Sequence, residues 1–202
     1  MIIRRNTGIE KLQDDVFRVP HSGPDPTGDL VLHLPFSKDE GDIASDASGH
    51  GHHGALVDGA VAHEDGVETD GKGGHVRIDH TSALKVGADH SDFTVSVRVK
   101  LLKGYTGDYR TLAKKGDFWG ERSFALYLSP DTNHVHFAIS TTDSFSETDS
   151  TYEELPVNKW AHLALVKDDS HVKLYINGRV DTAFELDGKS IGDEGAIYLG
   201  AD

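Results

Sequence analysis

The strongest constraint on the fold of this chain is a two-residue alternation of apolar and polar side chains. The clearest example is the segment 93–99, FTVSVRV, in which every second residue is Phe or Val. Successive side chains of a β-strand point to opposite faces, so this pattern predicts a strand with one buried face. The alternation recurs in 124–128, 134–139 and 172–176. Helical periodicity is nearly absent, and the expected fold class is therefore all-β.

Polar turns separate these predicted strands. The pair Asn177-Gly178 is the one favoured in tight two-residue hairpins, and other turn-forming residues fill 129–133 and 167–170. Strands therefore follow one another at intervals of roughly ten residues, which is typical of two-sheet sandwiches. We expect two packed antiparallel sheets.

The beginning of the chain differs from the rest. Residues 21–28, HSGPDPTG, are rich in Pro and Gly and are typical of a linker. We therefore predict an N-terminal arm and linker over residues 1–28, in which 15–19 could form one strand. The remaining residues, 29–202, are predicted to form one domain, because a chain of this length can bury a substantial core.

The balance of charged residues narrows the choice of partners. The chain has 34 Asp and Glu against 20 Lys and Arg, a net charge of −14, and no basic run of five or more residues. A nucleic-acid partner is therefore not expected. Acidic residues occur throughout the chain, as in proteins adapted to high salt, and a salt-rich, halophilic setting is our hypothesis.

The chain contains no cysteine. This excludes a disulfide framework, a thiolate metal site and a cysteine nucleophile. Arg4 and Arg5 near the N-terminus are not followed by an apolar run. We therefore expect neither a signal peptide nor membrane insertion, and these features leave the compartment open.

Six segments, in order and spacing, resemble laminin-G-like domains of the concanavalin A-like lectin/glucanase family. The first two are 29–36, DLVLHLPF, and 44–54, ASDASGHGHHG, which is similar to the D-x-S-G-x-G-x-x-G loop of that family. The others are 67–71, 93–100, 160–164 and 174–178. The resemblance covers about residues 29–201 and implies a two-sheet antiparallel jelly roll, often with a structural calcium ion. It implies no reaction, because lectins, adhesion modules and some glycan-cleaving enzymes share this sandwich.

The end of the chain departs from the family pattern. Members usually finish with a strand of the type D-E-V-R-I-Y beside the opening strand, whereas this sequence ends shortly after 196–200. An unpaired sheet edge is a liability that natural proteins avoid. Because 14–19, DDVFRV, carries the missing pattern, we predict that the arm supplies this pairing, within its own subunit or in a neighbour. The alternative is that the arm docks elsewhere or on a partner.

The resemblance also implies a calcium site. Hard cations take several oxygen ligands from carboxylates and backbone carbonyls. We predict that Asp46 and Gly49 of the 44–54 loop, together with Asp15 of the arm, bind a structural Ca²⁺. In the alternative, Asp46 forms an Asx-turn and its carboxylate caps the amides of the loop. The loop also contains three histidines, His50, His52 and His53. Because relatives carry one His there, two of the three are interpreted as surface substitutions rather than transition-metal ligands.

Binding of sugars or protein partners calls for flat rings combined with hydrogen-bonding groups. The predicted strands carry such side chains on the outward face of one sheet. The predicted ligand-binding residues are Arg98, Tyr127, His134, His136, His162 and Tyr175. Two alternatives stay open. The face could simply be solvated, or His134, His136 and His162 could bind zinc.

Catalytic activity is not expected. Retaining glycan hydrolysis needs two carboxyl groups about 5 Å apart. Glu68 and Asp70 have a suitable spacing, as do Glu147 and Asp149, but the first pair falls on an ordinary turn and the second in a Ser/Thr-rich segment interpreted as a solvated loop. Motifs of serine or zinc hydrolases are absent from the sequence.

These observations together predict a non-catalytic recognition or assembly module. We expect a surface-exposed structural protein of the virion decoration or fibre type, at a virion surface or otherwise extracellular. Its expected partners are a glycan or a host-surface protein, and neighbouring subunits contacted through the N-terminal arm. The alternative is a free glycan-binding module of a secreted protein. A glycan-cleaving enzyme is the third and weaker interpretation.

Overall fold

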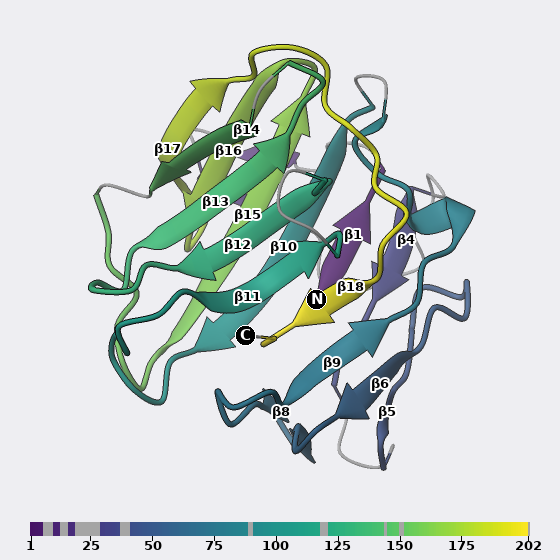
Figure 1. The fold of residues 1–202 in the computed structure, drawn as a ribbon, viewed down its shortest axis with the longest axis vertical. Helices are drawn as coiled ribbons and strands as arrows, with labels where there is room; N and C mark the ends of the chain where they lie inside the picture. The colour runs from purple at the N-terminus through teal and green to yellow at the C-terminus, as the bar shows by residue number, and fades with distance from the viewer. Residues whose placement is uncertain are drawn as a thin grey trace.

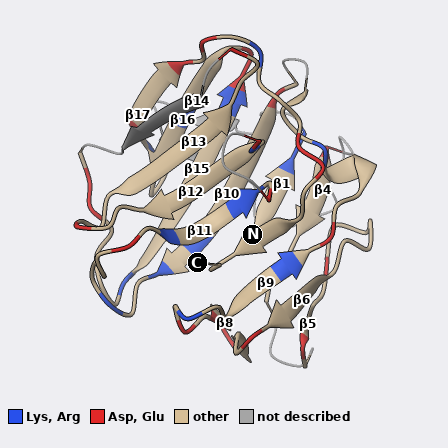
Figure 2. Ribbon diagram, in the orientation of Figure 1, with Lys and Arg blue, Asp and Glu red and all other residues tan. Residues whose placement is uncertain are grey.

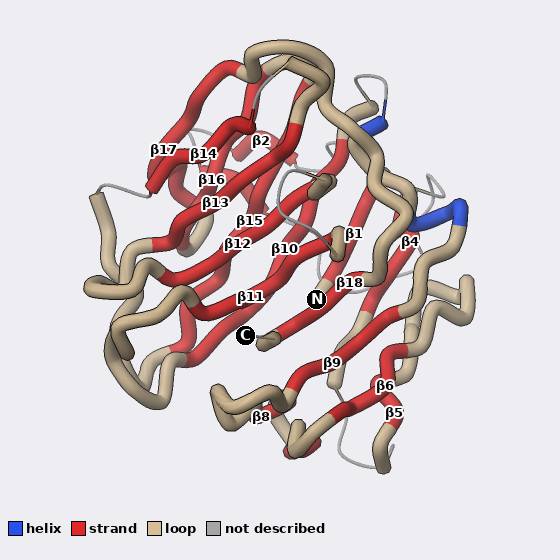
Figure 3. Tube along the Cα trace, in the orientation of Figure 1, coloured by secondary structure: helices blue, strands red, loops and turns tan. Residues whose placement is uncertain are grey.

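The computed structural model describes residues 1–5, 10–12, 16–18, 29–36, 41–88, 91–117, 121–143, 145–149 and 152–201, with only the backbone described in 10–12, 16–18 and 145–149. In these ranges the chain forms two eight-stranded antiparallel sheets (Figure 1). Its helical content is as low as the sequence predicts (Figure 3), and a short 3-10 helix occupies Ser82–Leu84. The predicted all-β, two-sheet antiparallel sandwich is confirmed.

The first sheet has the strand order β2-β3-β17-β16-β15-β10-β1-β4. In that order the strands are Glu10–Leu12, Val16–Arg18, Arg179–Glu185, His171–Ile176, Trp160–Asp168, Phe93–Lys100, Ile2–Arg4 and Leu30–His33. The second sheet has the order β14-β13-β12-β11-β18-β9-β6-β5. Its strands are Phe145–Asp149, Val135–Ser140, Phe124–Leu128, Arg110–Lys115, Ile197–Leu199, His75–Ile78, Gly54–Val57 and Ile43–Ala44. A separate hairpin consists of β7 (Val61–His63) and β8 (Gly66–Glu68).

The alternating sequence pattern places the core between the two sheets. Phe93 and Val95 of β10 have no exposed surface, and neither do Phe124 of β12 and Phe137 of β13 in the other sheet. The rings of Phe93 and Phe124 meet across the interface, with 6.1 Å between their centroids. Burial of such side chains is the main source of stability in a sandwich of this kind.

The hairpin between β16 and β17 shows how local sequence fixes the pairing of strands. Asn177 and Gly178 have φ angles of 51° and 81°. A two-residue turn with two positive φ angles matches the right-handed twist of the flanking strands, and Asn and Gly are the residues that adopt it at lowest cost. The hairpin predicted from this pair is confirmed.

The place beside the opening strand β4 is taken by the first residues of the chain. β1 lies between β4 and β10 and pairs antiparallel with both (Figure 1). Ile3 has no exposed surface, and it supplies the core-facing apolar side chain that this position needs. The prediction that 14–19 fills this place is therefore wrong, although the missing strand does come from the N-terminal arm.

The segment predicted for that role lies at the opposite edge of the first sheet. β3 pairs with β2, and Val16 of β3 pairs with Arg179 of β17. These pairings lie within the chain and extend the first sheet beyond β17. The predicted linker boundary at residue 28 and the rest of the 14–19 segment, residues 14, 15 and 19, lie outside the described residues.

The outer faces of the two sheets are less polar than the sequence predicts. On the first sheet, Ala164, Val166 and Tyr175 form a buried cluster with Ile2. On the second sheet, a smaller buried cluster comprises Ala125, Tyr127 and Ala138. Much of each outer face is therefore closed to a ligand.

Candidate functional site

The loop 45–54, called the edge loop below, owes its shape to the Asp46 carboxylate. One carboxylate oxygen, Oδ1, accepts the amides of His33 and Ser48 at 3.0 and 2.9 Å. Oδ2 accepts the Ser48 hydroxyl at 2.7 Å and the amide of His52 at 2.9 Å. Burial raises the pKa of Asp46, but these hydrogen bonds outweigh burial and hold the pKa below its ordinary value.

Two histidines of the edge loop also serve its structure. The ring of His52 binds the Val31 carbonyl through Nδ1 at 2.9 Å and lies 3.0 Å from the Thr81 hydroxyl through Nε2. The Nδ1 atom of His53 accepts the amide of Asp46 at 3.1 Å. Together with Asp46, these contacts cover backbone groups on the outer side of β4, which would otherwise be an open sheet edge.

The calcium site stays a prediction, and of its three residues Asp46 and Gly49 are described. Each oxygen of Asp46 already accepts two hydrogen bonds, so the geometry is that of the alternative, an Asx-type cap of the loop amides. Gly49 has a φ of 92°, which serves the turn of the loop. Asp15 lies outside the described residues. Within the described ranges, His, Asp and Glu side chains form no group of three that could hold a metal ion.

The structure divides the predicted ligand-binding residues between two sheets. Arg98, His162 and Tyr175 belong to β10, β15 and β16 of the first sheet, whereas Tyr127 and His136 belong to β12 and β13 of the second. The prediction that they share one sheet face is wrong. Strands of both sheets have the same alternation of apolar and polar residues, so this pattern does not specify to which sheet a strand belongs. His134, His136 and His162 are likewise not brought together as a zinc site.

The two predicted tyrosines are largely buried. Tyr175 is 3% exposed within the outer cluster of the first sheet, and Tyr127 is 8% exposed. The hydroxyl of Tyr127 accepts a hydrogen bond of 2.9 Å from the buried Arg122, whose guanidinium also lies over the tyrosine ring. Neither ring is free to stack on a sugar.

The three predicted histidines have partners in the protein. His136 packs against the ring of Tyr109, with centroids 5.3 Å apart. The imidazole of His134 lies 3.6 Å from the Glu154 carboxylate. His162 lies opposite Arg98 in the β10–β15 pair, and its Nε2 is 2.7 Å from the Ser96 hydroxyl.

Three connecting segments are joined into one surface, which we call the loop end: residues 101–109, 129–134 and 152–160. The amide of Asn158 donates to the carbonyl of Leu101 at 2.7 Å, and that of Gly107 donates to Pro130 at 2.8 Å. A third bond of 3.0 Å joins Leu155 to the 129–134 segment. These backbone bonds hold the three segments side by side.

Most of the large apolar side chains that are exposed in the described ranges lie at the loop end. Nine large apolar residues are exposed in the described part of the chain, and six of them lie here: Leu102, Tyr105, Tyr109, Tyr152, Val157 and Trp160. Exposed aromatic clusters of this kind mark binding surfaces. Sequence reasoning missed Trp160, although it has the same parity along the β15 strand as His162 and therefore points outward with it.

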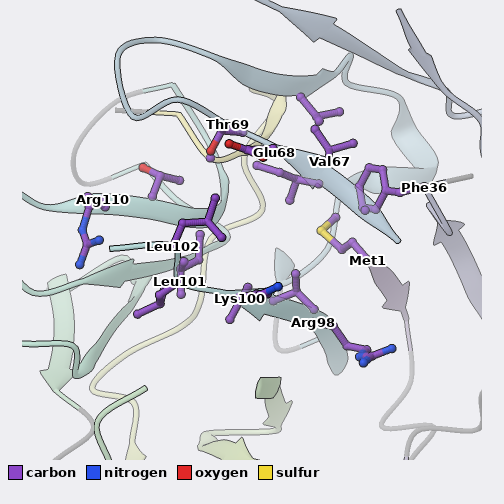
Figure 4. Close-up of a pocket in the computed structure, with 18 of the residues that line it drawn as sticks. Met1, Phe36, Val67, Glu68, Thr69, Arg98, Lys100, Leu101, Leu102 and Arg110 are labelled. Carbon is purple, nitrogen blue, oxygen red and sulfur yellow. The ribbon is translucent and has the colours of Figure 1, made fainter. Parts of the chain in front are cut away.

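A cleft of about 1350 Å³ lies beside the loop end, where the β7–β8 hairpin faces the end of β10 and the start of β11 (Figure 4). Its apolar lining includes Phe36, Val67 and Leu101, and its rim is charged. Glu68 lies on one side of the cleft in Figure 4, with Arg98 and Lys100 on the other. The hairpin β7–β8 forms the acidic side, and the end of β10 forms the basic side.

The carboxylates considered for catalysis have structural partners or lie at a sheet edge. Glu68 is 3.4 Å from His63 within the β7–β8 hairpin. Asp70 accepts the amides of Lys72 and Gly74, and these bonds lower its pKa. Residues 145–149, predicted as a solvated loop, form the edge strand β14, in which Asp149 is opposite His136.

No helix in the described part of the chain is both long and apolar enough to cross a membrane. Solved structures with a similar fold include a mutant of HCR/D, with a TM-score of 0.68 and 16% identity over 85% of this chain and 43% of that one. The receptor-binding domain of botulinum neurotoxin type G has a TM-score of 0.54 and 14% identity, covering 84% of this chain and 42% of that one. A sialidase of Trypanosoma rangeli has a TM-score of 0.60 and 16% identity, covering 94% and 31%.

These likenesses, at such low identity, concern the fold, and the chain spans less than half the length of each of these structures. A comparison with curated proteins finds no match. A family model, described as the concanavalin A-like lectin/glucanases superfamily, matches residues 70–202, which is more than half of the chain. The chain therefore belongs to the concanavalin A-like lectin/glucanases superfamily.

Proposed function

We propose that this protein is a non-catalytic recognition module that binds a carbohydrate at the loop end. The observation that carries the proposal is the gathering there of six of the nine exposed large apolar residues of the described chain. Aromatic rings stack on the apolar faces of sugars, and backbone and side-chain groups around them bind the hydroxyls. The family to which the chain belongs and a neighbour named as a receptor-binding domain support a recognition role.

The carbohydrate proposal is tested by titrating a panel of soluble polysaccharides into the protein and following the heat of binding. Tyr105 and Tyr152 are 65% and 80% exposed, so Tyr105→Ala and Tyr152→Ala should leave the fold intact and weaken binding several-fold, because each removes a stacking surface. Ile43→Ala, an exposed apolar residue of β5 in the second sheet, is the control and should bind normally. Unchanged binding in both tyrosine variants would contradict the assignment of the site.

The non-catalytic part of the proposal rests on the carboxylates. Glu68 and Asp70, the pair with a suitable spacing whose side chains are described, are engaged with His63 and with turn amides. The test is to incubate the protein with each polysaccharide that it binds and to measure reducing ends and chain length over time. We expect no change, and a shortened polymer that depends on the protein would contradict this part.

The biological setting is a separate proposal that rests on the sequence. The acidic composition favours a surface-exposed structural protein of a particle, virion decoration or fibre in type, with a glycan or a host-surface protein as its target. The competing setting is a free glycan-binding module of a secreted protein. Detection of the protein in purified particles supports the first setting, and detection only in the particle-free medium supports the second.

A further inference from the structure

A short segment of the chain has a net charge opposite in sign to that of the whole chain. Residues 98–115 contain six Lys and Arg and a single acid, a net charge of +5, although the whole chain carries −14. Figure 2 shows this basic colour where β10 ends and β11 begins, while acidic colour is concentrated in loops elsewhere. Such a local reversal of charge concentrates anions at one place on an otherwise repelling surface.

Three residues of this region and Trp160 of β15 line one side of the cleft and form what we call the basic–aromatic patch: Arg98, Lys100, Lys103 and Trp160. All four are exposed. Their positions are fixed by the β10–β15 pair, in which Lys100 lies opposite Trp160. The patch therefore stands on two paired strands of the first sheet rather than on a loop alone.

The contact with Trp160 holds the guanidinium of Arg98 in a position where it can bind an anion. The central carbon of this guanidinium lies 5.2 Å from the centre of the indole ring, in a cation–π contact. A stacked guanidinium keeps the N–H groups of its edge available, and their fork matches a carboxylate in two parallel hydrogen bonds. Within the described ranges, the guanidinium of Arg98 makes no hydrogen bond or ion pair.

The opposite side of the cleft is acidic. Glu64, Asp65 and Glu68 of the β7–β8 hairpin face the cleft, and Glu68 is already paired with His63. No ion pair joins this acidic side to Arg98 or Lys100 in the described part of the chain. An anionic ligand is therefore attracted to the β10 side and repelled by the carboxylates of the hairpin.

We infer that the carbohydrate bound at the loop end is an acidic polysaccharide whose carboxylate groups are held by Arg98, with Lys100 and Lys103 beside it. The inference rests on the proposed carbohydrate-binding function and adds the chemical class of the ligand. The exposed tyrosines contact the sugar rings, and the basic–aromatic patch binds their acidic groups.

Three polymers test the inference: polygalacturonate, which carries carboxylates, neutral dextran, and dextran sulfate. The natural protein should bind polygalacturonate more tightly than dextran, and added NaCl should weaken this binding. Arg98→Ala should weaken polygalacturonate binding roughly tenfold and leave dextran binding unchanged, and Arg98→Lys should lose part of that affinity because an ammonium group cannot make the bidentate contact. Lys189→Ala, which removes an exposed charge at the opposite end of the sandwich, is the matched control.

The outcomes distinguish a failure of the acidic-ligand inference from a failure of the carbohydrate-binding proposal. Equal affinity for dextran and polygalacturonate would overturn the acidic ligand and leave the carbohydrate proposal standing, whereas no binding to any polymer would overturn both. Equal loss on dextran sulfate in Arg98→Ala would overturn the assignment to carboxylates. If Arg98→Ala does not fold, Lys100→Ala takes its place, and normal polygalacturonate affinity in that variant would also count against the patch.

Discussion

The two ends of the sandwich use their basic residues in opposite ways. At the end away from the cleft, Lys115 has no exposed surface and donates to the Gly195 carbonyl at 2.7 Å, with His80 Nδ1 3.2 Å away. Lys167 is equally buried and donates to Ser91. At the loop end, Arg98 is exposed beside a tryptophan.

This difference shows where charged side chains remain available to bind a ligand. At the end away from the cleft, the buried Lys115 and Lys167 donate to backbone carbonyls, so they hold the segments around Gly195 and Ser91 in place. The edge loop follows the same rule with an anion, because Asp46 is saturated by hydrogen bonds from its own loop and from β4. In the described part of the chain, the loop end and the adjoining Arg98 bring exposed charged and aromatic groups together.

The largest predicted effect concerns Lys115. Burial lowers the pKa of this lysine to about 8, partly offset by Asp193, Asp117 and Glu194. In the unfolded chain the lysine keeps its ordinary pKa near 10.5, so between pH 8 and 10.5 the unfolded state binds more protons than the folded state. The free energy of unfolding should therefore rise with pH across this window, by up to about 3 kcal/mol.

Urea unfolding of the natural protein and of Lys115→Met at several pH values between 7 and 10.5 measures this effect. The variant should lose the part of the rise that Lys115 supplies, because Met has no proton to release, whereas Lys114 and Lys167, whose pKa burial also lowers, keep their contributions. Lys189→Met, in which the lost lysine is exposed, should keep the rise of the natural protein. A rise of the same size in Lys115→Met would show that the buried lysine is not its source, and the contrast between the two ends would weaken.

A smaller effect is expected at the edge loop. Asp46→Ala removes the acceptor of four hydrogen bonds and should lower the free energy of unfolding by about 2 kcal/mol, since the loop is only partly buried. Because its pKa is lowered in the folded state, the contribution of Asp46 is complete above the ordinary pKa of 3.8 and is lost as the pH falls through the folded value. Asp46→Asn keeps one acceptor and should fall between.

The same variants decide between the cap and the predicted calcium site. If Asp46 acts as a cap, added Ca²⁺ should not change the unfolding midpoint of the natural protein, and chelation should not lower it. A Ca²⁺-dependent rise in the midpoint that disappears in Asp46→Ala would support the calcium prediction.

The fold was predictable because its signals are local. Alternation in β10 and the Asn177-Gly178 turn act through neighbouring residues, so the sequence contains them directly. The partner of β4 was not predictable in the same way, because β1 is only three residues long and its strand character comes from pairing with β4 and β10. Strand order is a property of contacts distant in sequence, and no local pattern specifies it.

The candidate site was harder to predict for a related reason. Histidine and aspartate are natural site candidates when only the sequence is known. Here, however, His52, His53 and Asp46 make hydrogen bonds to nearby backbone groups. Whether a side chain such as Tyr175 is exposed depends on which residues cover its sheet face. The alternation of apolar and polar residues does not predict that covering. Arg98 was predicted correctly as outward-facing, and Trp160 could have been found by the same parity argument.

The smallest predicted effect on stability belongs to the loop end and completes the contrast. Arg98→Ala removes an exposed cation–π contact and should change the free energy of unfolding by at most about 1 kcal/mol, since such contacts are worth little in water. The variant should therefore unfold at nearly the same urea concentration as the natural protein while its polygalacturonate affinity falls. A loss of stability as large as that from Asp46→Ala would mean that Arg98 stabilises the fold, as Lys115 and Lys167 do at the end away from the cleft. A basic residue that matters for binding and hardly at all for folding is what distinguishes a recognition surface from a structural one.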